Sequence, residues 1–128
     1  FVCGNIFNDN QKNLYSMAVN QINHNSSLIK DGTTFKEFIE KSWKLPEEYY
    51  GNRYSVMVHG IGLCDEWPSI RYPTDGGDKG GIFQKNMTIT VESYIGKVGG
   101  KEGVKLEQQY LVGQNGLELM SHHPLEDI

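Results

Sequence analysis

The stretch MTITVESYIGKVGGKEGVKLEQQYLV, residues 87–112, contains two runs in which apolar and polar residues alternate. In the first run, Ile89 and Val91 alternate with Thr90 and Glu92, and the second run repeats this pattern around Glu107. A period of two is typical of β-strands, because successive side chains of a strand point to opposite faces. The stretch therefore predicts two strands, each with a glutamate near its middle.

The sequence on either side of this stretch predicts helices before it and a short strand after it. Leu14, Met17, Ala18 and Ile22 recur at helical spacing, and a capping-box pattern begins a second helix near Thr34. Polar, glycine-rich residues over 72–81 are typical of a surface loop, and an Asn-Gly pair predicts a hairpin turn. The further expected elements are helices over 9–28 and 34–45 and strands over 54–58 and 117–120.

Length and charge limit the domain organisation and the partners. A chain of 128 residues has room for one domain with a real core. Its net charge is −4, and its Lys and Arg residues are scattered along the sequence. Because nucleic-acid binding proteins gather positive charge into a patch or stripe, we expect no nucleic-acid partner.

The two cysteines and the hydropathy pattern bear on the compartment. Cys3 and Cys64 are too few and too far apart for a disulfide framework or a zinc knuckle, which favours two free thiols in a reducing compartment. The sequence has no apolar run near the roughly 20 residues that span a bilayer, and no charged-then-apolar leader at its start. We therefore expect a cytoplasmic protein without a membrane partner.

The stretch MVHGIGLCDEWPSIRY, residues 57–72, places His59 between glycines at the end of an expected strand. A histidine there is either a hydrogen-bonded structural residue or a metal ligand. A carboxylate in the middle of a strand, such as Glu92 or Glu107, costs free energy unless it is solvated, paired or bound to metal. Taken singly, either glutamate fits the solvent-facing side of an antiparallel sheet.

Read together and in order, the motifs HGIGL, MTITVES and GVKLEQQYLV resemble the C-terminal half of the creatinase and methionine aminopeptidase family. The resemblance covers about residues 50–121. It implies the pita-bread fold of that family, an α+β architecture with a curved antiparallel sheet and flanking helices. It also implies that residues 1–128 are the C-terminal part of a single catalytic domain.

This resemblance implies a metal site. His59 matches the metal-binding histidine of the family, Glu92 its first metal-binding glutamate and Glu107 the glutamate that bridges two metal ions. An imidazole with carboxylates suits iron, manganese, cobalt or zinc. Two further aspartates of the family have no match, because Asp9 and Asp31 lie in helical or loop surroundings.

The chain starts at Phe1 without an initiator methionine. We therefore expect that an N-terminal part carrying the two aspartates is missing from it. Without those ligands a dinuclear site lacks part of its coordination, so this chain alone is expected to bind metal weakly and to be inactive.

One departure from the peptidases concerns the residues after HGIGL. The peptidases place a His-Glu pair there, whereas this chain has Asp65-Glu66 after a gap that is one residue shorter. This exchange resembles the dimethylsulfoniopropionate lyase branch of the family. That resemblance implies β-elimination to dimethyl sulfide and acrylate, with Asp65 as the base and Tyr54 in substrate binding. It also implies a dinuclear, iron-type centre and a homodimer.

Two other functions stay open at the level of sequence. One is hydrolysis by an Xaa-Pro dipeptidase or aminopeptidase that has changed at one histidine, and the other is a non-catalytic binding module. A sulfonium substrate favours aromatic walls, which Tyr54, Trp67 and Tyr72 can supply. Trp67 and Tyr72 fit ordinary packing roles equally well.

Overall fold

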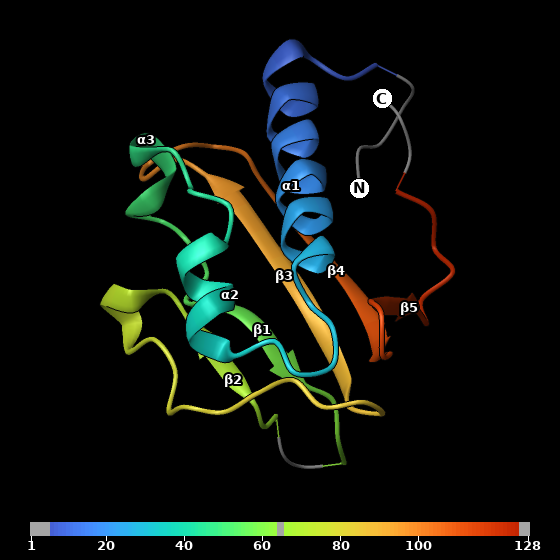
Figure 1. Cartoon of the computed structure of the whole chain (residues 1–128). Coiled ribbons are helices and arrows are strands. Elements are labelled where there is room, and N and C mark those ends of the chain that lie inside the picture. Colours follow the sequence, from blue (N-terminus) through green and yellow to red (C-terminus); the bar gives the residue numbers. More distant parts are fainter. Residues whose placement is uncertain (1–5, 64–65, 126–128) are drawn as a thin grey trace.

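The computed structural model describes residues 6–63 and 66–125 of the chain. These residues form an antiparallel five-stranded sheet in the order β2-β1-β3-β4-β5, with helices packed on one face (Figure 1). The expected α+β architecture is confirmed. The elements are α1 (Asp9–Ser27), α2 (Phe35–Lys41), α3 (Glu47–Tyr50), β1 (Val56–Gly60), β2 (Ser69–Arg71), a 3-10 turn (Pro73–Asp75), β3 (Thr88–Gly96), β4 (Gly103–Val112) and β5 (Leu117–Leu119).

Helix α1 has its start set by local sequence and its position set by its apolar face. Asn8 caps the helix by accepting a hydrogen bond from the backbone N–H of Gln11, and the Gln11 side chain accepts one from the Asn8 backbone. Leu14, Ala18 and Ile22 are buried, and the helix lies across β3 and β4. The helix predicted over 9–28 is confirmed.

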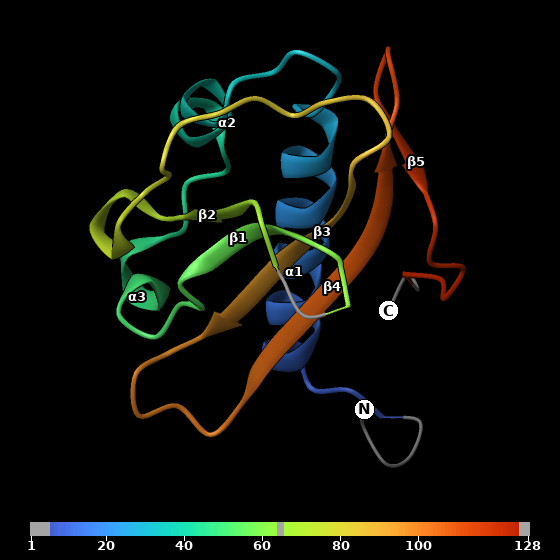
Figure 2. The same cartoon turned by 90° about the horizontal axis from the view of Figure 1, so that it is seen from below.

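The register of β3 with β4 divides their side chains between two faces of the sheet. Ile89, Val91 and Ile95 are fully buried in the clusters that also hold residues of α1. Their neighbours Thr90 and Glu92 therefore point to the face away from the helices. Figure 2 shows α1 behind β3 and β4, so the polar face of this strand pair is not covered by a helix.

A buried chain of hydrogen bonds ties α1 to the sheet. The Ser93 hydroxyl donates to Gln21 Oε1 at 2.6 Å, and the Gln21 amide donates to the Tyr72 hydroxyl at 2.7 Å. All three side chains are buried. Burial raises the pKa of Tyr72, while its bond from Gln21 acts in the opposite direction. Ser93, Gln21 and Tyr72 thus each have a hydrogen-bond partner, as buried polar groups require.

The structure corrects several of the predicted boundaries. The strand predicted over 54–58 runs from Val56 to Gly60, so His59 lies within β1. The second predicted helix ends at Lys41, because the backbone N–H of Trp43 donates to Asn25 Oδ1 and draws the chain away from the helix. The hairpin and its short last strand are confirmed, as β5 pairs with β4. In the described part of the chain, no helix has the length and apolar character needed to cross a bilayer.

Candidate metal centre

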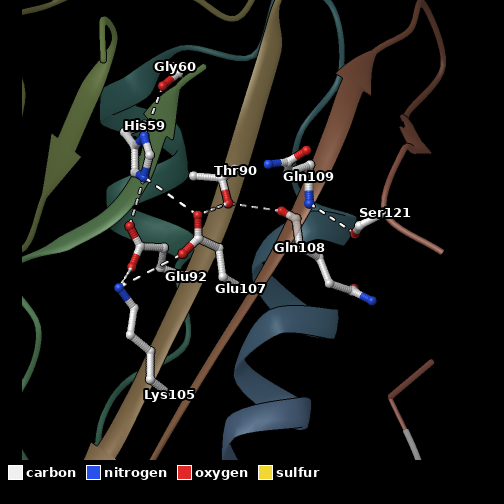
Figure 3. Close-up of polar contacts among 9 residues, drawn as sticks. All are labelled: His59, Gly60, Thr90, Glu92, Lys105, Glu107, Gln108, Gln109 and Ser121. Atoms are coloured by element: carbon white, nitrogen blue, oxygen red, sulfur yellow. Dashed lines mark hydrogen bonds and ion pairs between the residues drawn. The ribbon is translucent and has the colours of Figure 1, made fainter. Parts of the chain in front are cut away.

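Three neighbouring strands bring His59, Glu92 and Glu107 to the same face of the sheet. In the register, His59 of β1 lies opposite Thr90 of β3, and Glu92 of β3 lies opposite Glu107 of β4. Residues two apart on a strand share a face, so the three side chains converge. One ligand atom from each lies within 4.8 Å of the other two. Figure 3 shows the cluster on the side of the sheet away from α1.

The distances within the cluster are those of hydrogen-bonded and ion-paired groups. His59 Nε2 lies 2.8 Å from Glu92 Oε1 and 3.9 Å from Glu107 Oε1. The other ring nitrogen, Nδ1, lies 2.8 Å from the backbone oxygen of Gly60. Nε2 thus faces both carboxylates, while Nδ1 is engaged by the main chain (Figure 3).

The contacts of His59 test whether a metal ion fits the cluster. Both ring nitrogens face oxygen atoms that only accept hydrogen bonds, and a neutral imidazole carries one N–H. If Nδ1–H donates to Gly60, the lone pair of Nε2 points at Glu92 Oε1, and this contact requires either a proton on one of the two atoms or a cation bound by both. Metal-binding histidines commonly donate their second nitrogen to a backbone carbonyl in this way. The residues therefore fit a divalent cation.

The two glutamates form a pair of like charges directly across two strands, which destabilises a sheet unless the charges are compensated. The Glu92 side chain is 2% exposed and that of Glu107 is 39% exposed. Burial rules out the solvated alternative for Glu92, because a buried carboxylate requires a charge partner. The cluster thus has negative charge in excess of what His59 alone can balance.

Lys105 and Tyr54 complete the site, and the role of Lys105 was not predicted from the sequence. Lys105 Nζ lies 2.6 Å from Glu92 Oε2, 3.8 Å from Glu107 Oε2 and 4.2 Å from the centre of the Tyr54 ring. Burial lowers the pKa of Lys105, but the attraction of Glu92 and then of Glu107 outweighs this effect, so the pKa is raised overall. The described residues offer Glu92 Oε2 no hydrogen bond of normal geometry, which makes the ammonium its charge partner.

Thr90 orients Glu107. Its hydroxyl lies 3.0 Å from Glu107 Oε1 and 3.2 Å from the backbone oxygen of Gln108, and its single hydrogen can serve either acceptor. Thr90→Val keeps the shape of this fully buried side chain and removes the donor. We expect cobalt(II) affinity to fall by about tenfold, as for other outer partners of metal ligands, and stability to fall by about 1 kcal/mol. Absorption titration and thermal unfolding measure the two effects.

Thr88→Val is the matched control for this substitution. Thr88 lies on the same strand, and its hydroxyl donates to the backbone oxygen of Ile61 at 3.1 Å instead of to a carboxylate. Its replacement should cost stability without a change in cobalt affinity. Equal affinities for Thr90→Val and the wild type would show that Thr90 does not position Glu107.

The remaining residues singled out in the sequence fall into different settings. Tyr54 is 42% exposed and precedes β1, whereas Tyr72 is buried and belongs to the core. Trp67 is half exposed and packs edge-on against Phe35. Tyr72 is therefore a packing residue rather than a wall of the site. The proposed base Asp65 and both cysteines lie outside the described residues.

Asp9 and Asp31, which do not match the metal-binding aspartates of the family, have structural roles. Asp9 begins α1, and Asp31 accepts a hydrogen bond from the backbone N–H of Lys85 at 2.8 Å. Neither belongs to the group of possible metal ligands found among residues 6–63 and 66–125.

Comparison of the sequence with known proteins identifies both a family and characterised relatives. Residues 1–114 match metallopeptidase family M24. The chain is 35% identical over 117 residues to dimethylsulfoniopropionate lyase DddP of Roseovarius nubinhibens and 32% identical over 117 residues to the protein of the same name from Roseobacter denitrificans. Each match covers 88% of this chain and 26% of the relative, so the chain spans about a quarter of the length of these proteins.

Comparison of the structure with solved structures gives the same family of folds. The X-Pro aminopeptidase from Thermotoga maritima matches with a TM-score of 0.70 and 26% identity, covering 93% of this chain and 33% of the aminopeptidase. The prolidase from Pyrococcus horikoshii matches with a TM-score of 0.73 and 23% identity, covering 94% of this chain and 34% of the prolidase. The expected pita-bread fold is confirmed.

Proposed function

Because the chain belongs to metallopeptidase family M24, we propose that it contributes part of a metal-dependent active site, and that the reaction is cleavage of dimethylsulfoniopropionate. The observation that carries the choice of reaction is the 35% identity to a dimethylsulfoniopropionate lyase over most of this chain. The converging imidazole and carboxylates support a metal-dependent mechanism.

His59, Glu92 and Glu107 are the residues that would hold the metal. Their nitrogen and oxygen donors suit iron, manganese, cobalt or zinc, and we propose a dinuclear iron centre in the active protein, as in the lyase branch that the sequence resembles. When bound, the metal stabilises negative charge that develops on the substrate carboxylate. Glu107 is proposed for the bridging role, which is supported by its two oxygens facing different neighbours, His59 and Lys105.

Asp65 is proposed as the base of the elimination. It follows His59 by six residues, where the peptidase pattern has a histidine. A carboxylate there can take the proton from the carbon next to the substrate carboxylate. The electrons of that C–H bond form the C=C bond of acrylate, and the C–S bond breaks with its electron pair remaining on sulfur, so neutral dimethyl sulfide leaves.

Tyr54 is proposed to contact the sulfonium end of the substrate. The ammonium of Lys105 lies 4.2 Å from the centre of its ring, and this cation–π contact supports the proposal. The side chain is 42% exposed, so part of it is open to a substrate.

The second candidate is hydrolysis of Xaa-Pro peptides. It is favoured by the 26% identity and the fold shared with an X-Pro aminopeptidase. The stretch HGIGLCDEWP argues against hydrolysis, because it lacks the second histidine of the peptidase pattern. That histidine would assist the developing oxyanion. A carboxylate at that position would repel the same oxyanion.

Two assays on the protein that carries this chain separate the candidates. We expect the iron-loaded protein to release dimethyl sulfide from dimethylsulfoniopropionate, measured by gas chromatography, and to leave an Xaa-Pro dipeptide intact. Removal of metal with a chelator should abolish the release, and iron(II) should restore it. Cleavage of the dipeptide without release of dimethyl sulfide would establish the hydrolase instead.

We further propose that the protein acts on a small-molecule substrate, forms a homodimer and is located in the cytoplasm. The assignment of residues 1–128 to the C-terminal part of a catalytic domain likewise stays a prediction.

A further inference from the structure

Lys105 lies on the side of the glutamate pair opposite His59. Each carboxylate has its Oε1 atom toward the imidazole and its Oε2 atom toward the ammonium. Figure 3 shows the two glutamates between these two positive or potentially positive groups. The arrangement therefore offers two cation positions, and Lys105 occupies the one formed by the Oε2 atoms.

The contacts of Lys105 are too specific for an ordinary surface lysine. Its ammonium lies 2.6 Å from the 2% exposed carboxylate of Glu92, and the Tyr54 ring packs against it from another side. Lys97 is a useful contrast, because it pairs with Glu48 at the same 2.6 Å distance while both side chains are more than half exposed. Exposed pairs of that kind contribute little, whereas a buried carboxylate depends on its partner.

We propose that Lys105 and a divalent metal ion compete for the carboxylates of Glu92 and Glu107. Before a metal binds, the ammonium balances the two like charges and holds both carboxylates in place. A metal ion that uses the Oε2 atoms must displace the ammonium, which can move toward solvent because the Lys105 side chain is 44% exposed and its stem is flexible. The proposal rests on the assignment of these glutamates as metal ligands, but not on which reaction the protein catalyses.

Cobalt(II) titration of the full chain tests this competition, with binding followed by visible absorption. Lys105→Met removes the charge and keeps the length of the side chain. We expect it to bind cobalt at least about tenfold more tightly than the wild type, because a positive charge a few ångströms from the ion is lost. Lys105→Arg keeps the charge and should stay within about threefold of the wild type, as should the exposed-pair control Lys97→Met.

Thermal unfolding in the presence of a chelator supplies a second measurement. Lys105→Met should unfold at a lower temperature than the wild type, because Glu92 loses its partner. Added cobalt should raise the unfolding temperature of Lys105→Met by more than it raises that of the wild type. A purely structural role of Lys105 would lower stability without raising cobalt affinity. If Lys105→Met does not fold by circular dichroism, Lys105→Gln provides the same test, since its amide can still donate to Glu92.

Equal or weaker cobalt affinity in the folded neutral variant would overturn the proposal, and so would the absence of cobalt binding in every variant. The lyase assay is independent of this result. If the protein cleaves peptides instead of dimethylsulfoniopropionate, the proposed competition between Lys105 and the metal ion is unaffected. If the cobalt affinity of the Lys105 variants is unchanged, the competition is disproved, but either reaction is still possible.

Discussion

In the protein that carries this chain, Asp65→Asn is expected to lower the release of dimethyl sulfide by a factor of about 10² or more, because an amide cannot accept the proton that the proposed elimination removes. The substitution keeps the shape of the side chain, and Asp65 is not among the proposed metal ligands. Metal content should therefore stay at the wild-type level. Gas chromatography of dimethyl sulfide and metal analysis of the same preparation measure both quantities.

Asp78→Asn is a suitable control for this substitution. Asp78 lies in the glycine-rich loop, and its carboxylate accepts a hydrogen bond from the backbone N–H of Gly80. An asparagine can keep that bond, so activity should be unaffected. Full lyase activity in Asp65→Asn would remove Asp65 from the mechanism.

In the protein that carries this chain, Glu92→Gln should abolish metal binding and, with it, the proposed lyase activity. Loss of an outer partner of a ligand costs roughly 10- to 100-fold in metal affinity, and loss of a ligand itself should cost at least as much. The amide keeps the volume of a side chain that is 2% exposed, so the fold should persist. Metal analysis after dialysis, together with circular dichroism, separates lost binding from lost structure.

Glu118→Gln on β5 makes the same chemical change on an exposed side chain of the same sheet. It should bind metal as the wild type does. If Glu92→Gln also retained its metal after dialysis, Glu92 would have to be a structural carboxylate that is balanced by His59 and Lys105 alone.

The elements with a strong periodic signal were predictable from the sequence. The long helix α1 and the strands β3 and β4 carry repeated apolar positions over nine residues or more. Strand β2 and helix α3 were not predicted, since three or four residues are too few for a period to show. The end of α2 depends on a bond from Trp43 to Asn25, which belongs to tertiary structure.

The three clustered side chains could be predicted from the sequence, but the balance of charges around them could not. The order of the motifs marked His59, Glu92 and Glu107, and the structure brings the three together. The contact of Lys105 with Glu92 depends on the register that sets Glu92 opposite Glu107. The alternation along β4 places Lys105 on the same face as Glu107, but the register between strands is a tertiary property, so the contact with Glu92 could not be predicted from the sequence.

The bond from Ser93 to Gln21 has a mechanical consequence for its neighbour Glu92. Consecutive residues of a strand point to opposite faces of the sheet. The bond that holds Ser93 on the face covered by α1 therefore restricts rotation of β3 about its own axis. The same restriction fixes the direction in which the Glu92 side chain leaves the strand on the other side. Helix α1, through Gln21, thus helps to orient a carboxylate on the opposite face of the sheet.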